Sequence, residues 1–178
     1  MKLINRTFDE LQPGDTAELD RLITLDDLYA FAAASGNYNP MHLPAEDGDG
    51  DGTAESVAPG MFVASLIATV LGMRLPGPGT LYRRQSLDFH DRAHAGDDLR
   101  CTVKVVDKLT DGAVRMATEV RRVSDDALIV SGTAEVLAPT TRFDRDDMEM
   151  PGLIVQRHRH FDALLDRAHA LPALPTAG

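Results

Sequence analysis

The sequence contains very little cysteine: Cys101 is the only one among 178 residues. A single cysteine cannot form a disulfide within the chain, and it suits a reducing cytoplasm. Long apolar runs are also missing, because no stretch approaches the roughly 20 residues of a membrane-spanning helix. The first residues likewise lack an apolar segment of signal-peptide length. We therefore expect a soluble cytoplasmic protein that has no membrane partner.

Basic residues are in the minority. There are 18 lysines and arginines against 28 aspartates and glutamates, which gives a formal net charge of −10. Proteins that bind nucleic acid in general need a basic surface that displaces counterions from the phosphates. The charge balance therefore argues against nucleic acid as a partner, although a few local arginines can still hold an anionic ligand.

The chain is long enough for one sizeable core, since 43% of its residues are hydrophobic, and no second catalytic domain or internal repeat is evident. Its one biased segment, residues 46–55, contains five acids and three glycines. Three aspartates there match the first, third and fifth ligands of an EF-hand calcium loop. The twelfth position, which needs a glutamate, is Ala58, and Pro44 interrupts the preceding helix. We expect a mobile acidic loop rather than a calcium site.

Hydrophobic periodicity predicts the regular elements. Thr24 followed by two aspartates is a typical helix start, so a helix over 25–34 should follow a strand over 17–24. Residues 59–73 are apolar nearly all round, which indicates a helix wrapped by other elements. Further strands are expected over 80–90, 99–108, 113–123 and 128–137. One buried helix followed by a four-stranded antiparallel meander indicates an α+β fold whose sheet curls around the helix.

The stretch Ser35-Gly36-Asn37-Tyr38-Asn39-Pro40-Met41-His42 carries the strongest local signal. Gly36 is suited to end the preceding helix, and Asn-x-Asn-Pro is typical of a turn. Such a turn is often purely structural. It can also hold two polar groups around one water, because His42 follows Asn37 by five residues. The residues alone leave both interpretations open.

Two later stretches place this motif in a context. Pro59-Gly60-Met61-Phe62 opens the apolar helix, and Leu75-Pro76-Gly77-Pro78-Gly79 leads into the next strand. The three stretches together resemble the MaoC-like (R)-specific enoyl-CoA hydratase/dehydratase family, which has the hot-dog fold, a curled antiparallel sheet around one long central helix. The resemblance extends over about residues 20–138 and includes Gln85, Phe89, Gly96 and Asp97. Two positions differ, because the family has Asp at position 37 and His at position 59.

The resemblance implies a lyase that adds water to an enoyl thioester or removes it from a 3-hydroxyacyl thioester, with acyl-CoA as substrate and no metal or other cofactor. His42 would act as acid and base, Asn37 would position the water, and the Gly60 N–H would hold the thioester oxygen. The other expected substrate contacts are Asn39, Met61, Ser65, Arg83 and Arg84. A curled sheet leaves an open edge, so we expect a homodimer or an oligomer of dimers, with a mixed dimer as an alternative.

Asn37 leaves other functions open, because an amide neither takes up nor releases a proton at neutral pH. The chain can instead be an acyl-CoA-binding protein without activity, or the silent subunit of a mixed dimer whose partner carries the full motif. Thioester hydrolysis is a further alternative. It needs a carboxylate that faces the helix start, and Glu55 is the only acid near that start in sequence.

Residues 139–178 differ from the rest, and we interpret them as a connector and one amphipathic C-terminal helix over about residues 153–171. The hot-dog domain would then cover residues 1–138. Hydratase domains fused ahead of a phosphate acyltransferase have a similar tail, so the chain resembles such an N-terminal domain. The histidines of this tail and the pair His90 and His94 lack a carboxylate cluster at ligand spacing, which predicts no metal site.

Overall fold

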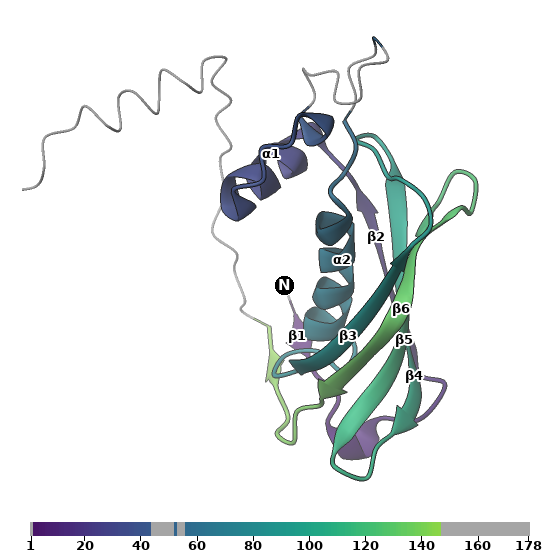
Figure 1. Cartoon of the computed structure of the whole chain (residues 1–178). Coiled ribbons are helices and arrows are strands. Elements are labelled where there is room, and N and C mark those ends of the chain that lie inside the picture. The colour runs from purple at the N-terminus through teal and green to yellow at the C-terminus, as the bar shows by residue number, and fades with distance from the viewer. Residues whose placement is uncertain (1, 44–51, 53–55, 147–178) are drawn as a thin grey trace, which may run out of the picture.

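The computed structural model describes residues 2–43, 52 and 56–146 (Figure 1). Five antiparallel strands form the main sheet in the spatial order β2-β4-β5-β6-β3. Their bounds are Thr16–Leu22 (β2), Leu81–Phe89 (β3), Asp98–Lys108 (β4), Ala113–Arg122 (β5) and Leu128–Leu137 (β6). The sheet curls around the helix α2 (Gly60–Met73), which confirms the expected α+β hot-dog fold.

The strand order differs from the expected four-stranded meander. β4, β5 and β6 are consecutive neighbours, but β3 pairs with β6 at the far edge instead of with β4, and β2 lies beside β4. The expected meander is therefore wrong, because periodicity locates strands without saying which neighbour each one pairs with. The connection from β3 to β4, residues 90–97, meets the chain just before α2, where the Ala58 N–H donates to the Ala93 carbonyl oxygen over 2.7 Å.

Helix α2 is buried on one side only. Its buried residues are spaced three and four apart, as one helix face requires, and comprise Val63, Ala64, Leu66, Ile67, Val70 and Leu71. All of them except Ala64 belong to the same core cluster as Cys101 and Val103 of β4 and Met116 of β5. The opposite side exposes Met61 and Ser65. The sheet therefore wraps the helix as expected but covers one face of it, so that the opposite face of this apolar helix is open in the single chain.

Helix α1 (Leu25–Ser35) begins at the expected cap, Thr24, with the reciprocal hydrogen bonds of a capping box. It ends at Gly36, whose φ of 70° lies in the left-handed region that glycine adopts without strain. The ring of Phe31 meets that of Phe62 edge-on, with centroids 5.6 Å apart. Because Phe62 is in the first turn of α2, α1 is docked at the N-terminal end of α2, and the turn after Gly36 starts there.

Four short elements complete the described chain. β1 (Leu3–Ile4) pairs with β7 (Asp144–Arg145), and 3-10 helices cover Phe8–Glu10 (η1) and Pro40–His42 (η2). No helix of the described part is long and apolar enough to cross a membrane. The expected C-terminal helix lies outside the described residues, as does the acidic segment apart from Gly52.

Asn5 ties the N-terminal segment to the chain that follows β6. The residue is buried, with 1% of its surface exposed. Its amide nitrogen donates to the carbonyl oxygens of Pro78 (3.0 Å) and Thr141 (2.9 Å), and its amide oxygen accepts the Phe143 N–H (2.8 Å). Both polar atoms of this buried side chain therefore have partners, which is the condition under which a buried polar group supports a fold.

Asn5→Asp should lower the free energy of unfolding at pH 7 by about 3 kcal/mol, because a carboxylate oxygen would face two carbonyl oxygens in place of a donor. Urea unfolding followed by circular dichroism measures this loss. Gln12→Glu makes the same amide-to-acid change at an exposed position and should cost about 0.5 kcal/mol or less. Equal stability of the two variants would contradict the role given to Asn5.

Candidate active site

The turn after α1 is built from two asparagine side chains. The Asn37 amide oxygen accepts the Asn39 N–H over 3.2 Å, and the Asn39 amide oxygen accepts the Met41 N–H over 3.2 Å. Each bond closes a short loop and satisfies a backbone donor. Pro40, with its fixed φ, opens the 3-10 helix η2 that ends at His42. The local sequence thus forms the expected turn and presents His42 at its end.

The orientation of Asn37 follows from this turn. Its amide oxygen is the atom that can accept the Asn39 N–H, so the amide nitrogen occupies the other side of the group. That nitrogen makes no hydrogen bond with any residue that the structure describes. An aspartate at this position would offer a second oxygen there. Asn37 therefore presents a donor where an aspartate would present an acceptor.

His42 is held by a backbone carbonyl. Its Nδ1 lies 2.8 Å from the carbonyl oxygen of Val57, and the Val57 N–H donates to the Met41 carbonyl oxygen over 3.1 Å. A carbonyl can only accept, so Nδ1 carries the proton and Nε2 of the neutral ring keeps its lone pair. The contact sets both the orientation and the tautomer of the imidazole, and it leaves Nε2 able to take up a proton.

The N-terminus of α2 supplies a complementary group. Pro59 precedes the first helical residue, Gly60, whose N–H has no acceptor within the helix. Such N–H groups carry the positive end of the helix dipole and suit an oxygen that gains negative charge. The Phe89 ring packs against this glycine, since a Cβ built at position 60 would lie 2.8 Å from Phe89 Cε1. Any side chain at this position would displace the ring.

His42 and Gly60 line the same cavity, which has a volume of about 240 Å³. Three other parts of the chain line it. The segment before α2 contributes Val57 and Ala58, the end of β3 and the following loop contribute Phe89, Asp91 and Arg92, and β6 contributes Val130. Of the described residues, Asn37 and Asn39 are exposed on the preceding turn and are not part of this lining. The structure thus brings two of the three expected catalytic residues into one cavity.

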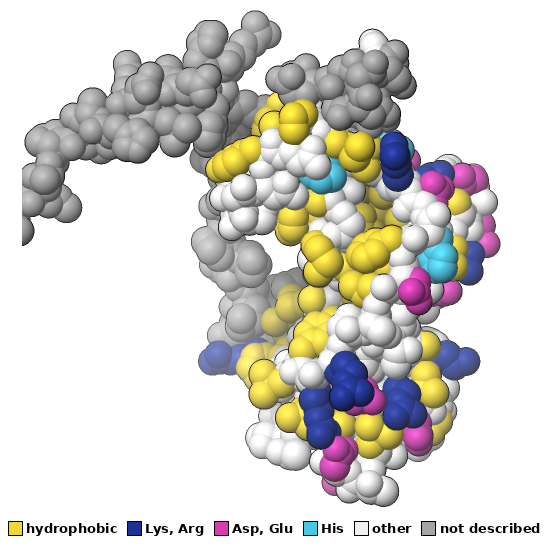
Figure 2. All heavy atoms as spheres, in the orientation of Figure 1, with side chains coloured by type: hydrophobic (Ala, Val, Ile, Leu, Met, Phe, Trp, Pro, Cys, Tyr) yellow, Lys and Arg dark blue, Asp and Glu magenta, His cyan; other side chains and the backbone are white. Residues whose placement is uncertain are grey.

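A larger groove of about 430 Å³ lies between the exposed face of α2 and strand β3. Four of the expected substrate contacts line it: Met61, Ser65, Arg83 and Arg84. Figure 2 shows hydrophobic side chains exposed over this part of the molecule, beside a group of basic side chains. The consecutive residues Gly60 and Met61 belong to different hollows. The expected site is therefore divided between two regions that meet at the first turn of α2.

Arg83 and Arg84 are adjacent in sequence but differ in their surroundings. The Arg83 guanidinium forms an ion pair with Asp111, and this hydrogen bond raises the pKa of the arginine above its usual value. The side chain of Arg84 has no ion-pair or hydrogen-bond partner among the described residues. Arg84 is therefore the member of the pair whose charge is available to an anionic ligand.

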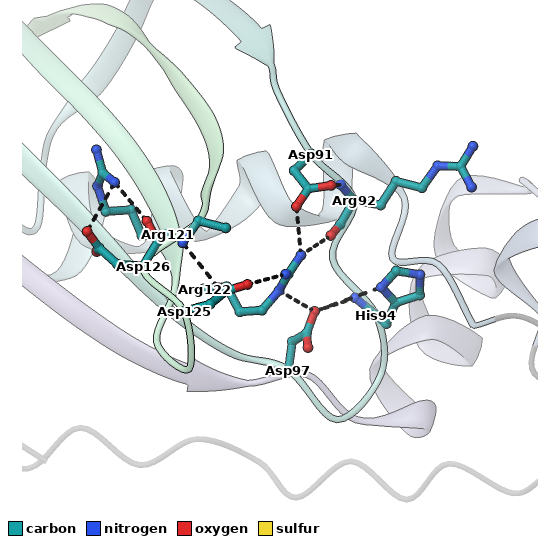
Figure 3. Close-up of polar contacts among 9 residues, drawn as sticks. Asp91, Arg92, His94, Asp97, Arg121, Arg122, Asp125 and Asp126 are labelled. Carbon is teal, nitrogen blue, oxygen red and sulfur yellow. Dashed lines mark hydrogen bonds and ion pairs between the residues drawn. The ribbon is translucent and has the colours of Figure 1, made fainter.

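Three residues in or near the cavity could not be identified from the sequence. Val57 acts through its carbonyl oxygen, which every residue type has. Asp91 lines the cavity, and its oxygens accept the Arg92 N–H (2.8 Å) and the Arg122 guanidinium (3.0 Å). These two bonds, the backbone one first, hold the pKa of Asp91 below its usual value. Arg122 lies at the end of β5, surrounded by acidic side chains (Figure 3), and belongs to no motif.

Comparison with known proteins agrees with this architecture. Residues 10–126 match the MaoC like domain family. The chain is 38% identical over 103 residues to the (R)-specific enoyl-CoA hydratase of Rhodospirillum rubrum, covering 58% of this chain and 72% of the relative. It is 32% identical over 132 residues to the 3-hydroxybutyryl-CoA dehydratase of Methylorubrum extorquens, covering 74% of this chain and 83% of that relative.

A solved structure agrees as well. The unliganded R-hydratase of Pseudomonas aeruginosa is 36% identical to this chain and superposes with a TM-score of 0.81, covering 88% of this chain and 100% of the other. The family match spans more than half of the 178 residues. With the hot-dog sheet, the Asn-x-Asn-Pro turn and the glycine at the helix start in place, the chain belongs to the MaoC-like domain family.

Proposed function

We propose that this protein is a hydratase/dehydratase that acts on enoyl and 3-hydroxyacyl thioesters of CoA. The observation that carries the proposal is the cavity shared by His42 and Gly60. An imidazole with a free Nε2 and an unpaired helix N–H are the two groups that addition of water to a conjugated thioester needs. The relatives from R. rubrum and M. extorquens are a hydratase and a dehydratase of CoA thioesters, which supports the substrate class.

In the hydration direction, His42 Nε2 takes a proton from a water molecule while the water oxygen bonds to C3 of the enoyl group. Electrons of the C2–C3 double bond move toward the thioester carbonyl, whose oxygen gains negative charge and is stabilised by the Gly60 N–H. The imidazolium then gives its proton to C2, so that a hydroxyl and a hydrogen have been added and His42 is neutral again. Dehydration is the same sequence in reverse.

Asn37 is a weaker partner in this reaction than an aspartate. Asn37 lies on the exposed turn outside the lining of the cavity, and its amide oxygen accepts the Asn39 N–H, so the group that it can add beside a water is the amide nitrogen, a hydrogen-bond donor. It cannot accept the proton. Loss of one of two acid/base partners commonly costs about 10²- to 10⁴-fold in rate. We therefore propose a slow enzyme in which His42 performs the proton transfer alone.

The two alternatives differ in their support. Thioester hydrolysis needs a free carboxylate at the helix start. Glu55 lies outside the described residues, and Asp91 has both oxygens engaged and a lowered pKa, which makes it a poor base. An acyl-CoA binder or the silent subunit of a mixed dimer is the second candidate, because Asn37 favours it.

We further propose a cytoplasmic homodimer formed through β3. Among the described strands, β3 is an edge of the sheet that pairs with β6 alone, and it exposes Leu81, Tyr82 and Phe89. An edge strand with exposed apolar side chains needs cover. The same strand of a second copy can supply it, since an antiparallel edge is complementary to itself, and the second copy would also cover the open face of α2. The single free cysteine, Cys101, suits the cytoplasm.

Light scattering at micromolar concentration should give twice the 19.3 kDa mass of one chain. Leu81→Glu should shift the protein toward the monomer, because the dimer would bury an unpaired charge. Leu22→Glu is the matched control: Leu22 is 51% exposed against 64% for Leu81, but it lies in β2 at the opposite edge of the sheet. A monomeric unsubstituted protein, or equal effects of both substitutions, would contradict pairing through β3.

Arg84→Gln should weaken the binding of butyryl-CoA about fivefold at low salt, because the free guanidinium is expected to contact the CoA phosphates. Butyryl-CoA has no double bond to hydrate, so calorimetry measures binding alone. Arg83→Gln should have a smaller effect, since that arginine is already paired with Asp111. The difference between the variants should shrink as salt screens the charge. Equal affinities at low salt would count against Arg84.

Asn37→Asp should raise kcat/KM on crotonyl-CoA by at least about tenfold, because the second carboxylate oxygen would take up a proton where the amide nitrogen now lies. His42→Ala should lower the rate by at least about 10²-fold. Loss of the absorbance of the conjugated thioester measures both. Asn39→Asp adds the same charge two residues away and should not raise the rate. If the unsubstituted protein and all variants are inactive while crotonyl-CoA still binds, the protein is a silent subunit and the hydratase proposal is wrong.

A further inference from the structure

The Arg122 guanidinium donates hydrogen bonds to four residues (Figure 3). It donates to the carboxylates of Asp91 (3.0 Å), Asp97 (3.3 Å) and Asp125 (2.9 Å) and to the carbonyl oxygen of Arg92 (2.6 Å). The side chain is 17% exposed. Burial alone would lower the pKa of Arg122, but the three carboxylates raise it. The planar fork of a guanidinium can reach acceptors in several directions at once, which the single ammonium of a lysine cannot.

These bonds clamp the loop between β3 and β4 at both of its ends. Asp91 and Arg92 stand at its start, and Asp97 stands at its end. Asp97 also closes the loop on itself, because its carboxylate accepts the His94 N–H (2.8 Å) and its own N–H donates to the His94 carbonyl oxygen (3.1 Å). One guanidinium therefore ties the two ends of the backbone segment 91–97 together.

The loop in turn holds the segment that carries Val57. The Ala58 N–H donates to the Ala93 carbonyl oxygen (2.7 Å), and the Ala95 N–H donates to the Ser56 carbonyl oxygen (3.0 Å). These two bonds lie on either side of Val57, which forms a β-bridge with His94. The Val57 carbonyl oxygen, fixed in this way, is the acceptor of His42 Nδ1.

We infer that Arg122 is a positioning residue for His42: through the loop of residues 91–97 and the Val57 carbonyl, it sets the tautomer and orientation of the imidazole. Arg122 itself touches neither the ring nor the cavity. If the clamp is removed, the loop and the Val57 carbonyl can shift, and a ring that loses its fixed acceptor populates both neutral tautomers. Only one of these leaves Nε2 free to act as a base.

The experiment compares Arg122→Gln with Arg121→Gln. Arg121 is the matched control. It is the neighbouring residue of β5 and also forms ion pairs, with Glu119 (3.4 Å) and Asp126 (3.5 Å), but it forms no hydrogen bond or ion pair with the loop of residues 91–97. Two-bond 1H–15N spectra of histidine rings report the tautomer. The chain has six histidines, and His42 is assigned by the signal that His42→Ala removes.

The unsubstituted protein and Arg121→Gln should show His42 with its proton on Nδ1, whereas Arg122→Gln should show a mixture of tautomers. A kinetic effect is expected as well, and this part of the inference rests on the proposed function. In Arg122→Gln, kcat on crotonyl-CoA should fall about 10- to 100-fold, with KM much less affected. An unchanged His42 tautomer in Arg122→Gln, or the same mixture in Arg121→Gln, overturns the inference whatever happens to the rate.

The spectra keep this test separate from the proposed function. A protein that is inactive on every enoyl-CoA refutes the proposed function, yet its His42 tautomer still decides the role of Arg122. If Arg122→Gln fails to fold, Arg122→Lys serves in its place, because it keeps the charge and the aliphatic stem but cannot bridge the separated acceptors. It should give the same mixture of tautomers, and a pure Nδ1–H form in this variant overturns the inference.

Discussion

The burial of α2 against the curled sheet is the constraint on which the site depends. Large apolar side chains contribute about 1.5 to 3 kcal/mol each when they are removed from water, and Ile67, Val70 and Leu71 are fully buried. The helix cannot slide or turn without exposing this face, so its first residue, Gly60, has a fixed place at the end of the sheet. The cavity and the loop that meets Ala58 take their positions from it.

Two of the polar groups that define the site at the start of α2 belong to the backbone. The Gly60 N–H marks where an oxyanion can lie, and the Val57 carbonyl oxygen fixes the His42 imidazole, whose Nε2 is the side-chain group in the cavity that can take up a proton. A framework of this kind tolerates the change of a single side chain such as Asn37 without repacking. Family membership is for the same reason a better guide to substrate class than to rate.

Charge is distributed in a way that matters for an anionic substrate. A net charge of −10 repels CoA at long range, so recognition has to come from arginines at close quarters. Arg83, Arg100 and Arg122 are paired with carboxylates and serve the fold, whereas Arg84 has no such partner among the described residues. The number of arginines near a groove is thus a poor measure of the charge that a ligand meets.

The sequence alone determined the local features: the bounds of the main helices and strands to within about two residues, the cap at Thr24, the turn that ends at His42, and the family motifs that indicated the hot-dog fold. Such features depend on neighbours a few residues apart. Only the tertiary structure decided that β3 pairs with β6, that one face of α2 stays open, and that the expected site divides into two hollows. Sequence also could not indicate that Arg122 would bind Asp91, 31 positions away, because such contacts exist only once the sheet has brought distant segments together.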